Sequence, residues 1–310
     1  MRLCVLALLL WPVLYGQDVP VTTLKQTGLF ALPSDPSRIA RVSSAGGVLW
    51  FLLQNGNWSE LLSTDMAGGN PTQFAIQPPA KRVAFPVSAI CASRDGRIAV
   101  VRAEGTVEIY QPGGALLETV PLPHPVSNCV LDHGLWVWSK TGADFLNGGR
   151  VDLSIPQPQL PKFGYVDLLG LADHGVGLLE SMKGVFYTLD QQAGNWIPHP
   201  LDAPEFQAIR KLPVQEDGTT VPFVMSPSVA GGEFYALANH TNRKIGARIL
   251  RFDVQGNLKA RYLCPLPTSV VPPTGMNPNG YLSPNIVVVM DRVMLLISQS
   301  QKVVASYSLE

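Results

Sequence analysis

The chain has 310 residues and a formal net charge of zero, and charged residues make up only 15% of it. Because no run of Lys and Arg stands out, nucleic acid and anionic membrane surfaces are poor candidates for its natural partner. The 28 glycines and 27 prolines are spread between apolar segments, which indicates a folded chain with many turns rather than a disordered one.

The first residues have the pattern of a secretory signal. Arg2 supplies a positive charge, and Leu3 to Leu14 form an almost uninterrupted apolar stretch that ends just before Gly16. A membrane span takes roughly 20 residues, so this stretch is too short for one. We predict a cleaved signal over residues 1–16, a single domain over 17–310 and a secreted or periplasmic protein with no membrane span. The alternative interpretation is an uncleaved N-terminal anchor.

One sequence pattern, a turn followed by a short apolar strand, recurs along the chain. It begins at Gly47, Gly96, Gly134, Gly175, Gly232 and Asp291. The successive intervals are 49, 38, 41, 57 and 59 residues. A period of roughly 40–50 residues with about four strands per unit is typical of a β-propeller.

The second repeat shows the expected strands most clearly. They are predicted at Ser88–Ala92, Arg97–Arg102, Thr106–Gln111 and Ala115–Pro121. Asp95-Gly96 and Gly113-Gly114 supply turns that tolerate positive φ. Runs that are apolar on both faces suit inner strands that are sandwiched between neighbouring blades.

The last repeat predicts how the ring closes. It has strands at Asn285–Met290, Val293–Ile297 and Lys302–Ser308, but the chain then ends without an outer strand. The segment Gln26–Leu32 reads as a strand that belongs to no repeat. We therefore predict an all-β, six-bladed β-propeller with four-stranded blades, whose last blade is closed by this N-terminal strand.

Two connections between repeats are unusually long, at about Pro200–Thr220 and Pro265–Pro284. Loops of this size usually bind ligands or cover sites. Within the first, an N-cap and capping-box pattern predicts a short helix near 203–211. We expect the ligand site on the face that carries these loops. The residues proposed for it are Phe85, Phe163, Phe206, Arg210, Lys211, Arg243 and Lys244.

The fifth repeat resembles a blade of the NHL-repeat and TolB-like propellers. The resemblance rests on Gly232-Glu233-Phe234-Tyr235-Ala236-Leu237, on the turn around Asn242-Arg243, and on Arg248-Ile249-Leu250-Arg251-Phe252-Asp253 followed by Gly256. The family's aspartate after the first strand is absent here and the turn is longer. The other repeats match only in strand and glycine spacing. The resemblance implies six blades and a role in binding a protein or a small ligand.

Three cysteines follow the signal. Cys91 and Cys129 each stand five residues before a turn glycine, so they occupy equivalent places on adjacent inner strands. A disulfide between them would suit an oxidising compartment. The favoured interpretation is two small buried residues that pack between sheets, because a disulfide needs Cα atoms within roughly 7 Å and inner strands are often farther apart. Cys264 is expected at the end of an outer strand without a partner.

An enzymatic role is the alternative function. No two of the five histidines have a metal-ligand spacing, and no catalytic residue can be nominated. Calcium-dependent lactonases and esterases with six blades use carboxylate and amide oxygens that converge on the central channel. The residues proposed for such a site are Glu180, Asn239, Asn128 and Asp167.

We therefore expect a monomeric binding module without a cofactor, and calcium only under the alternative. The aromatic residues that alternate within strands are interpreted as blade core rather than as carbohydrate platforms: Trp50, Trp136, Trp138 and Tyr235.

Overall fold

The computed structural model describes residues 19–32, 38–78, 86–122, 124–131, 134–138, 143–147, 150–154, 166–171, 175–180, 183–190, 192–203, 225–238, 245–268 and 279–310. Within these ranges the chain forms strands and turns and no helix, so the described part contains no helix able to span a membrane. The predicted all-β class is confirmed. The helix predicted near 203–211 falls, apart from its first residue, outside these ranges.

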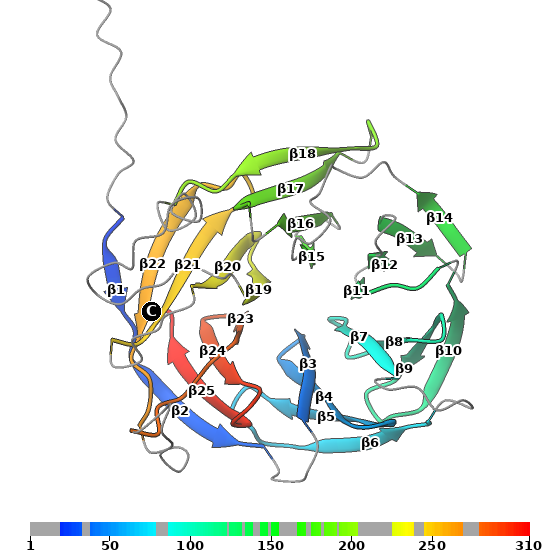
Figure 1. Ribbon diagram of the computed structural model, residues 1–310, viewed down its shortest axis with the longest axis horizontal. Helices are drawn as coiled ribbons and strands as arrows, with labels where there is room; N and C mark the ends of the chain where they lie inside the picture. Colours follow the sequence, from blue (N-terminus) through cyan, green and yellow to red (C-terminus); the bar gives the residue numbers. More distant parts are fainter. Residues whose placement is uncertain are drawn as a thin grey trace, which may run out of the picture.

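The strands form six sheets that lie around a central axis (Figure 1). Five of the sheets have the four strands predicted for a blade. The first comprises β3 (Arg38–Ala45), β4 (Val48–Asn55), β5 (Trp58–Asp65) and β6 (Thr72–Ile76). The second comprises β7 (Val87–Ala92), β8 (Ile98–Arg102), β9 (Thr106–Tyr110) and β10 (Leu116–Pro121).

The next sheets follow in chain order. One comprises β11 (Asn128–Leu131), β12 (Leu135–Trp138), β13 (Ala143–Asn147) and β14 (Arg150–Ser154). Another comprises β15 (Val166–Gly170), β16 (Val176–Glu180), β17 (Val185–Asp190) and β18 (Asn195–Pro200). The five-stranded sheet comprises β19 (Met225–Ala230), β20 (Glu233–Ala238), β21 (Ala247–Asp253), β22 (Leu258–Cys264) and β1 (Val21–Thr23). The last comprises β23 (Ile286–Met290), β24 (Val293–Ser298), β25 (Val303–Ser308) and β2 (Gln26–Ala31).

The N-terminal strand closes the last sheet as predicted. β2 pairs antiparallel with β25, with Phe30 opposite Val304 and Ala31 opposite Val303. The first and last parts of the chain thus share one sheet, and β2 covers the edge that β25 would otherwise expose.

The sheet of β19 to β22 corrects the expectation of six four-stranded blades: five sheets have the four strands of a blade, and this one has five strands. β1 pairs in parallel with β22, placing Val21 opposite Arg261. The guanidinium Nη1 of Arg261 also donates to the carbonyl of Val19 at 2.8 Å, and the Leu24 amide donates to the carbonyl of Leu263 at 2.9 Å. The chain therefore runs along the outer edge of this sheet before β2 enters the next one. We call β1 and β2 together the N-terminal clasp, because they bind two neighbouring sheets.

Apolar clusters fill the spaces between neighbouring sheets. Between the β15–β18 and β19–β22 sheets, for example, the rings of Phe186 and Phe234 stack 4.6 Å apart, and Phe252 stacks on Phe234 at 5.1 Å. Buried aromatics of this kind dominate core energetics. The four aromatics predicted as core are all buried, at 1–8% exposure: Trp50, Trp136, Trp138 and Tyr235.

The repeated turn glycine has a backbone reason. Gly96, between β7 and β8, has φ of +85°, and a Cβ there would lie 2.9 Å from Cγ of Pro112. In the last repeat Asp291 takes the equivalent place with φ of +52°. Aspartate tolerates this region better than most residues, so the turn survives where the glycine is missing.

The innermost strands form a closed ring. β3, β7, β11, β15, β19 and β23 contact one another in that order, and β23 contacts β3 again. They lie nearest the centre in Figure 1. Because each opens an equivalent repeat, we take all six to begin at the same end of the ring, and this end is called the ring entrance.

Candidate functional site

The six inner strands carry few charged side chains. Among the six inner strands as described, only three residues are charged: Arg38 and Arg41 on β3, and Asp167 on β15. β3 and β15 lie opposite one another, because two strands separate them in either direction around the ring. All three residues stand in the first half of their strands, near the ring entrance. Opposite charges thus face each other across an otherwise neutral ring.

Arg41 is held by backbone carbonyls rather than by a carboxylate. Its Nε donates to the carbonyl of Ser88 on β7 at 3.1 Å, and its Nη1 donates to the carbonyl of Ala40 at 3.0 Å. Residue Arg41 is exposed to solvent. The surrounding protein still desolvates it in part, which lowers the pKa of Arg41, while the charge of Asp167 opposes that shift. Guanidinium has five N–H donors, so these two bonds orient the group without saturating it.

Asp167 is half-buried on β15, where it pairs with Leu179 of β16. Burial raises the pKa of its carboxyl to about 6, and the charge of Arg41 acts against the increase. The two side chains are close enough to influence each other electrostatically, yet they form no direct ion pair. Each charge is therefore only partly compensated, which is costly in a partly desolvated place.

Glu180 at the end of β16 is fully buried and already has partners. Nζ of Lys183 lies 3.4 Å from its Oε1, and the hydroxyl of Tyr187 donates to its Oε2 at 3.3 Å. Burial raises the pKa of Glu180, and Lys183 opposes this. Burial, together with the charge of Glu180, raises the pKa of Tyr187 to about 12. These contacts tie the turn between β16 and β17 to the sheet.

The residues proposed as calcium ligands make their contacts in separate places. Glu180 binds Lys183, Asp167 faces Arg41, and Oδ1 of Asn128 accepts the Cys129 amide at 2.8 Å. Asn239 lies outside the described ranges. In the described part of the chain, no three His, Cys, Asp or Glu residues group as a metal site would require. A guanidinium facing Asp167 also disfavours a second cation there.

The residues proposed for ligand binding all fall outside the described ranges: Phe85, Phe163, Phe206, Arg210, Lys211, Arg243 and Lys244. Most of the two long loops lies outside them as well. The binding face therefore stays a prediction at these positions.

Cys91 and Cys129 form a disulfide between β7 and β11, with Cα atoms 5.8 Å apart. The favoured interpretation of two separate thiols was wrong. The hydroxyl of Ser88 on β7 also donates to the carbonyl of Val126, just before β11, at 3.0 Å. Cys264 is a buried free cysteine at the end of β22, as predicted.

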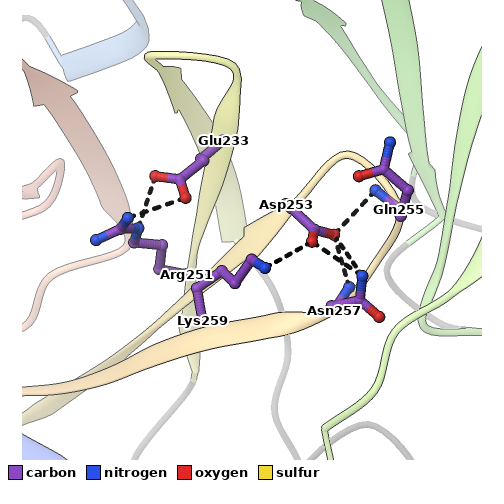
Figure 2. A network of polar contacts seen from close by, with 6 residues as sticks. All are labelled: Glu233, Arg251, Asp253, Gln255, Asn257 and Lys259. Atoms are coloured by element: carbon purple, nitrogen blue, oxygen red, sulfur yellow. Dashed lines mark hydrogen bonds and ion pairs between the residues drawn. The ribbon is translucent and has the colours of Figure 1, made fainter.

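A second polar network lies on β20, β21, β22 and the turn between β21 and β22 (Figure 2). Arg251 donates from Nε and Nη2 to the two carboxylate oxygens of Glu233 at 2.6 and 2.9 Å. Asp253 accepts the amides of Gln255 and Asn257 at 3.0 and 2.9 Å. All of these groups are satisfied within the sheet, so the network is structural.

The sequence contained unused signals for the Asp253 turn and for the charged residues of the inner strands. An aspartate followed by glycine and asparagine recurs in three turns between third and fourth strands, beginning at Asp65, Asp190 and Asp253. Arg41 was missed entirely. Its signal is an arginine inside a first strand, Arg38–Ala45, whose counterparts in the other repeats carry no basic residue.

The fold defines the class: this chain is a β-propeller. No protein-family model matches it, and no curated protein matches it. Among solved structures, a virginiamycin B lyase from Staphylococcus aureus, crystallised as a catalytically inactive variant with quinupristin, aligns with a TM-score of 0.53 and 11% identity, over 93% of this chain and 89% of that one. A streptogramin B lyase aligns with a TM-score of 0.51 and 16% identity, over 91% and 86%. The structure of U3-55K aligns with a TM-score of 0.60 and 10% identity, over 91% and 98%. At these identities the likeness establishes the fold alone.

Proposed function

We propose that this protein is an exported β-propeller that binds a protein or a small ligand at the ring entrance, and that it acts as a binding module rather than as an enzyme. The observation that carries the proposal is the pair Arg41 and Asp167, two partly compensated opposite charges on inner strands whose described residues carry one other charge, Arg38.

Partly desolvated charges destabilise a fold unless a partner compensates them. Where a protein retains such destabilising charges, they are expected to serve a function such as binding a ligand. The turns between the second and third strands of each blade lie at the ring entrance, so a ligand there would contact them.

The disulfide supports export. Disulfides persist in oxidising compartments and are rare in the cytosol, and Cys91–Cys129 joins two inner strands of the folded ring. A signal over residues 1–16 would end shortly before β1 begins at Val21. Mass spectrometry of the mature protein would test both points. We expect cleavage close to Gly16, a mass decreased by two hydrogens per disulfide and a monomer by light scattering. An intact N-terminus in the exported protein would contradict the signal.

We also propose to count the five-stranded sheet as a sixth blade, with β1 as an addition to its outer edge. Its four other strands, β19 to β22, have the antiparallel order of a blade. This count agrees with the NHL-like pattern in the same repeat, and the family assignment remains part of the proposal.

The test is a thermal-shift screen of small molecules and peptides on the wild-type protein and on an Arg41→Gln/Asp167→Asn double variant. We expect a ligand to raise the melting temperature of the wild type and not of the variant. Without ligand, the variant should melt at the same or a higher temperature. A variant that is clearly less stable, with no ligand found for the wild type, would make the pair structural and refute the proposal.

Calcium-dependent hydrolysis remains the alternative function. It predicts that calcium raises the melting temperature and that a chelator reverses the effect. A binding module without metal should not respond. Under the alternative, Asp167→Asn would abolish the calcium response, whereas a control substitution on an outer strand, Glu118→Gln, would leave it intact.

A further inference from the structure

Two neighbouring inner strands bulge near the ring entrance. In β3 the pairing with β4 passes over Ala40, and in β7 the pairing with β8 passes over Ser88. A bulge takes its extra residue out of the ladder and re-aims the side chains beside it. The carbonyl groups of Ala40 and Ser88 are thereby available to side chains.

Arg41 binds both of these carbonyl groups. Its Nη1 donates to the carbonyl of Ala40 at 3.0 Å, and its Nε donates to the carbonyl of Ser88, on the neighbouring sheet, at 3.1 Å. A guanidinium has five N–H donors, and Nη2 of Arg41 has no acceptor among the described residues. The two bulges therefore orient the guanidinium and leave Nη2 for a further acceptor.

A third sheet also reaches the bulge in β3. Gln299 lies in the turn between β24 and β25, and its Nε2 donates to the carbonyls of Ile39 and Ala40 at 3.0 and 3.3 Å. The Ala40 carbonyl thus accepts from both Gln299 and Arg41. Because a carbonyl oxygen has two lone pairs, these two donors saturate it and restrain its direction.

The side chain of Gln299 is itself held by Asn285, which immediately precedes β23. Nδ2 of Asn285 donates to Oε1 of Gln299, and Oδ1 of Asn285 accepts the backbone amide of Gln299 at 3.0 Å. Since Oε1 is occupied by this donor, Nε2 is directed towards β3. The orientation of the Gln299 side chain is therefore set within its own sheet.

We infer that Gln299 is a positioning residue for the ring entrance: through the bulged carbonyl of Ala40 it holds the guanidinium of Arg41, so that Nη2 donates to an acceptor group of the ligand. The inference rests on the proposed binding function and deepens it. Arg41 is the group that contacts the ligand, whereas Gln299 acts only through β3. A guanidinium that is already held in one orientation loses less side-chain entropy on binding.

NMR spectroscopy of the Arg41 guanidinium in the mature protein tests the inference without a ligand. The readout is the rate at which the Nε proton of Arg41 exchanges with water. The internal reference is Arg94, which is exposed in the turn after β7 and has no side-chain hydrogen bond within the described ranges. We expect Gln299→Ala to speed the exchange at Arg41 about fivefold, through the loss of one hydrogen bond's restraint, and to leave Arg94 unchanged.

Gln301→Ala is the matched control. Gln301 lies in the same turn, where its Oε1 accepts the Ser283 amide at 2.6 Å and its Nε2 donates to the carbonyl of Tyr281 at 2.9 Å. Neither bond reaches β3, so this variant should leave the exchange at Arg41 unchanged. Should Gln299→Ala fail to fold, Gln299→Glu serves the same purpose, because a carboxylate cannot donate to the β3 carbonyls.

Two results would overturn the inference: an unchanged exchange rate at Arg41 in Gln299→Ala, or an equal increase in Gln299→Ala and Gln301→Ala. A ligand found in the thermal-shift screen should raise the melting temperature of Gln299→Ala less than that of the wild type, and that of Gln301→Ala as much. If the exchange result is as expected and no ligand is found, the proposed function fails while the positioning of Arg41 stands. If a ligand binds and the exchange does not change, the binding stands and the role of Gln299 is refuted.

Discussion

Two aspartates of this propeller show how differently one side chain can be used. Asp253, in an outer turn, accepts the amides of Gln255 and Asn257 and pairs with Lys259 at 3.0 Å. Burial opposes its ionisation, but the hydrogen bonds to Asn257 and the pairing with Lys259 outweigh burial and hold its pKa below the usual range. At the ring entrance, burial raises the pKa of Asp167 to about 6, and the charge of Arg41 opposes this increase only in part.

The ionised carboxylate of Asp253 therefore stabilises the fold, whereas that of Asp167 weakens it. The periphery of the propeller satisfies its polar atoms locally and so contributes to stability. At the ring entrance the charges of Asp167 and Arg41 are only partly compensated. Perturbed pKa values of this kind are common at functional sites.

The first prediction tests the periphery. Deletion of residues 17–33 removes the N-terminal clasp and exposes the edges of both β22 and β25. We expect this to remove a large part of the roughly 5–15 kcal/mol that stabilises a typical domain, seen as loss of cooperative unfolding by circular dichroism. A truncated protein with an unchanged melting temperature would show that the ring closes without the clasp.

The second prediction concerns the ring itself. The disulfide encloses a sequence separation of 38 residues, so the paired substitution Cys91→Ser/Cys129→Ser should lower the free energy of unfolding by about 3–4 kcal/mol. Urea denaturation with and without reductant measures it. Cys264→Ser provides the matched control, because that thiol is unpaired and should not change the response to reductant. Equal effects from reductant on both variants would argue against the disulfide.

The third prediction concerns Asp167 and its pH dependence. Its folded-state pKa lies above the unfolded value, so the neutral form is favoured in the fold, and stability is lost as pH rises from about 4 to about 6. At pH 7.5, Asp167→Asn should therefore stabilise the protein by up to about 3 kcal/mol, and the gain should vanish near pH 4. Urea denaturation at both pH values tests this. A variant that is less stable than wild type at pH 7.5 would make the carboxylate structural.

The fourth prediction is the opposite case. Because the pKa of Asp253 is lowered in the fold, its contribution is present above the unfolded value and lost as pH falls below about 4. Asp253→Ala should destabilise the protein by about 1–2 kcal/mol at pH 7.5, through the loss of its hydrogen bonds, and by less at pH 3. Destabilisation that does not depend on pH would point to the turn backbone rather than to the charge.

Much of the fold could be predicted because it repeats. The strands of the second repeat were placed within a residue of β7 to β10 at nearly every end, and the pairing of β2 with β25 followed from a missing outer strand. β1 escaped prediction because three exposed residues, Val21 to Thr23, carry no alternating pattern. Its strand exists only because the edge of β22 is available.

The site was predicted less well. Asp167 was proposed as a calcium ligand that could approach the central channel, but the charge that acts on it is that of Arg41, 126 positions earlier in the chain. Local patterns cannot bring such residues together, because only closure of the ring sets β3 opposite β15. The same limit explains the disulfide, since its formation depends on how closely β7 and β11 approach.

The sequence by itself determined the repeat, the turns and the apolar character of the inner strands, because these follow from local backbone preferences and from burial on both faces of a strand. The tertiary structure alone decided which charges meet across the axis, which cysteines are joined and which sheet carries a fifth strand. These depend on distances between segments far apart in the chain, and such distances are settled only when the ring closes and its blades pack.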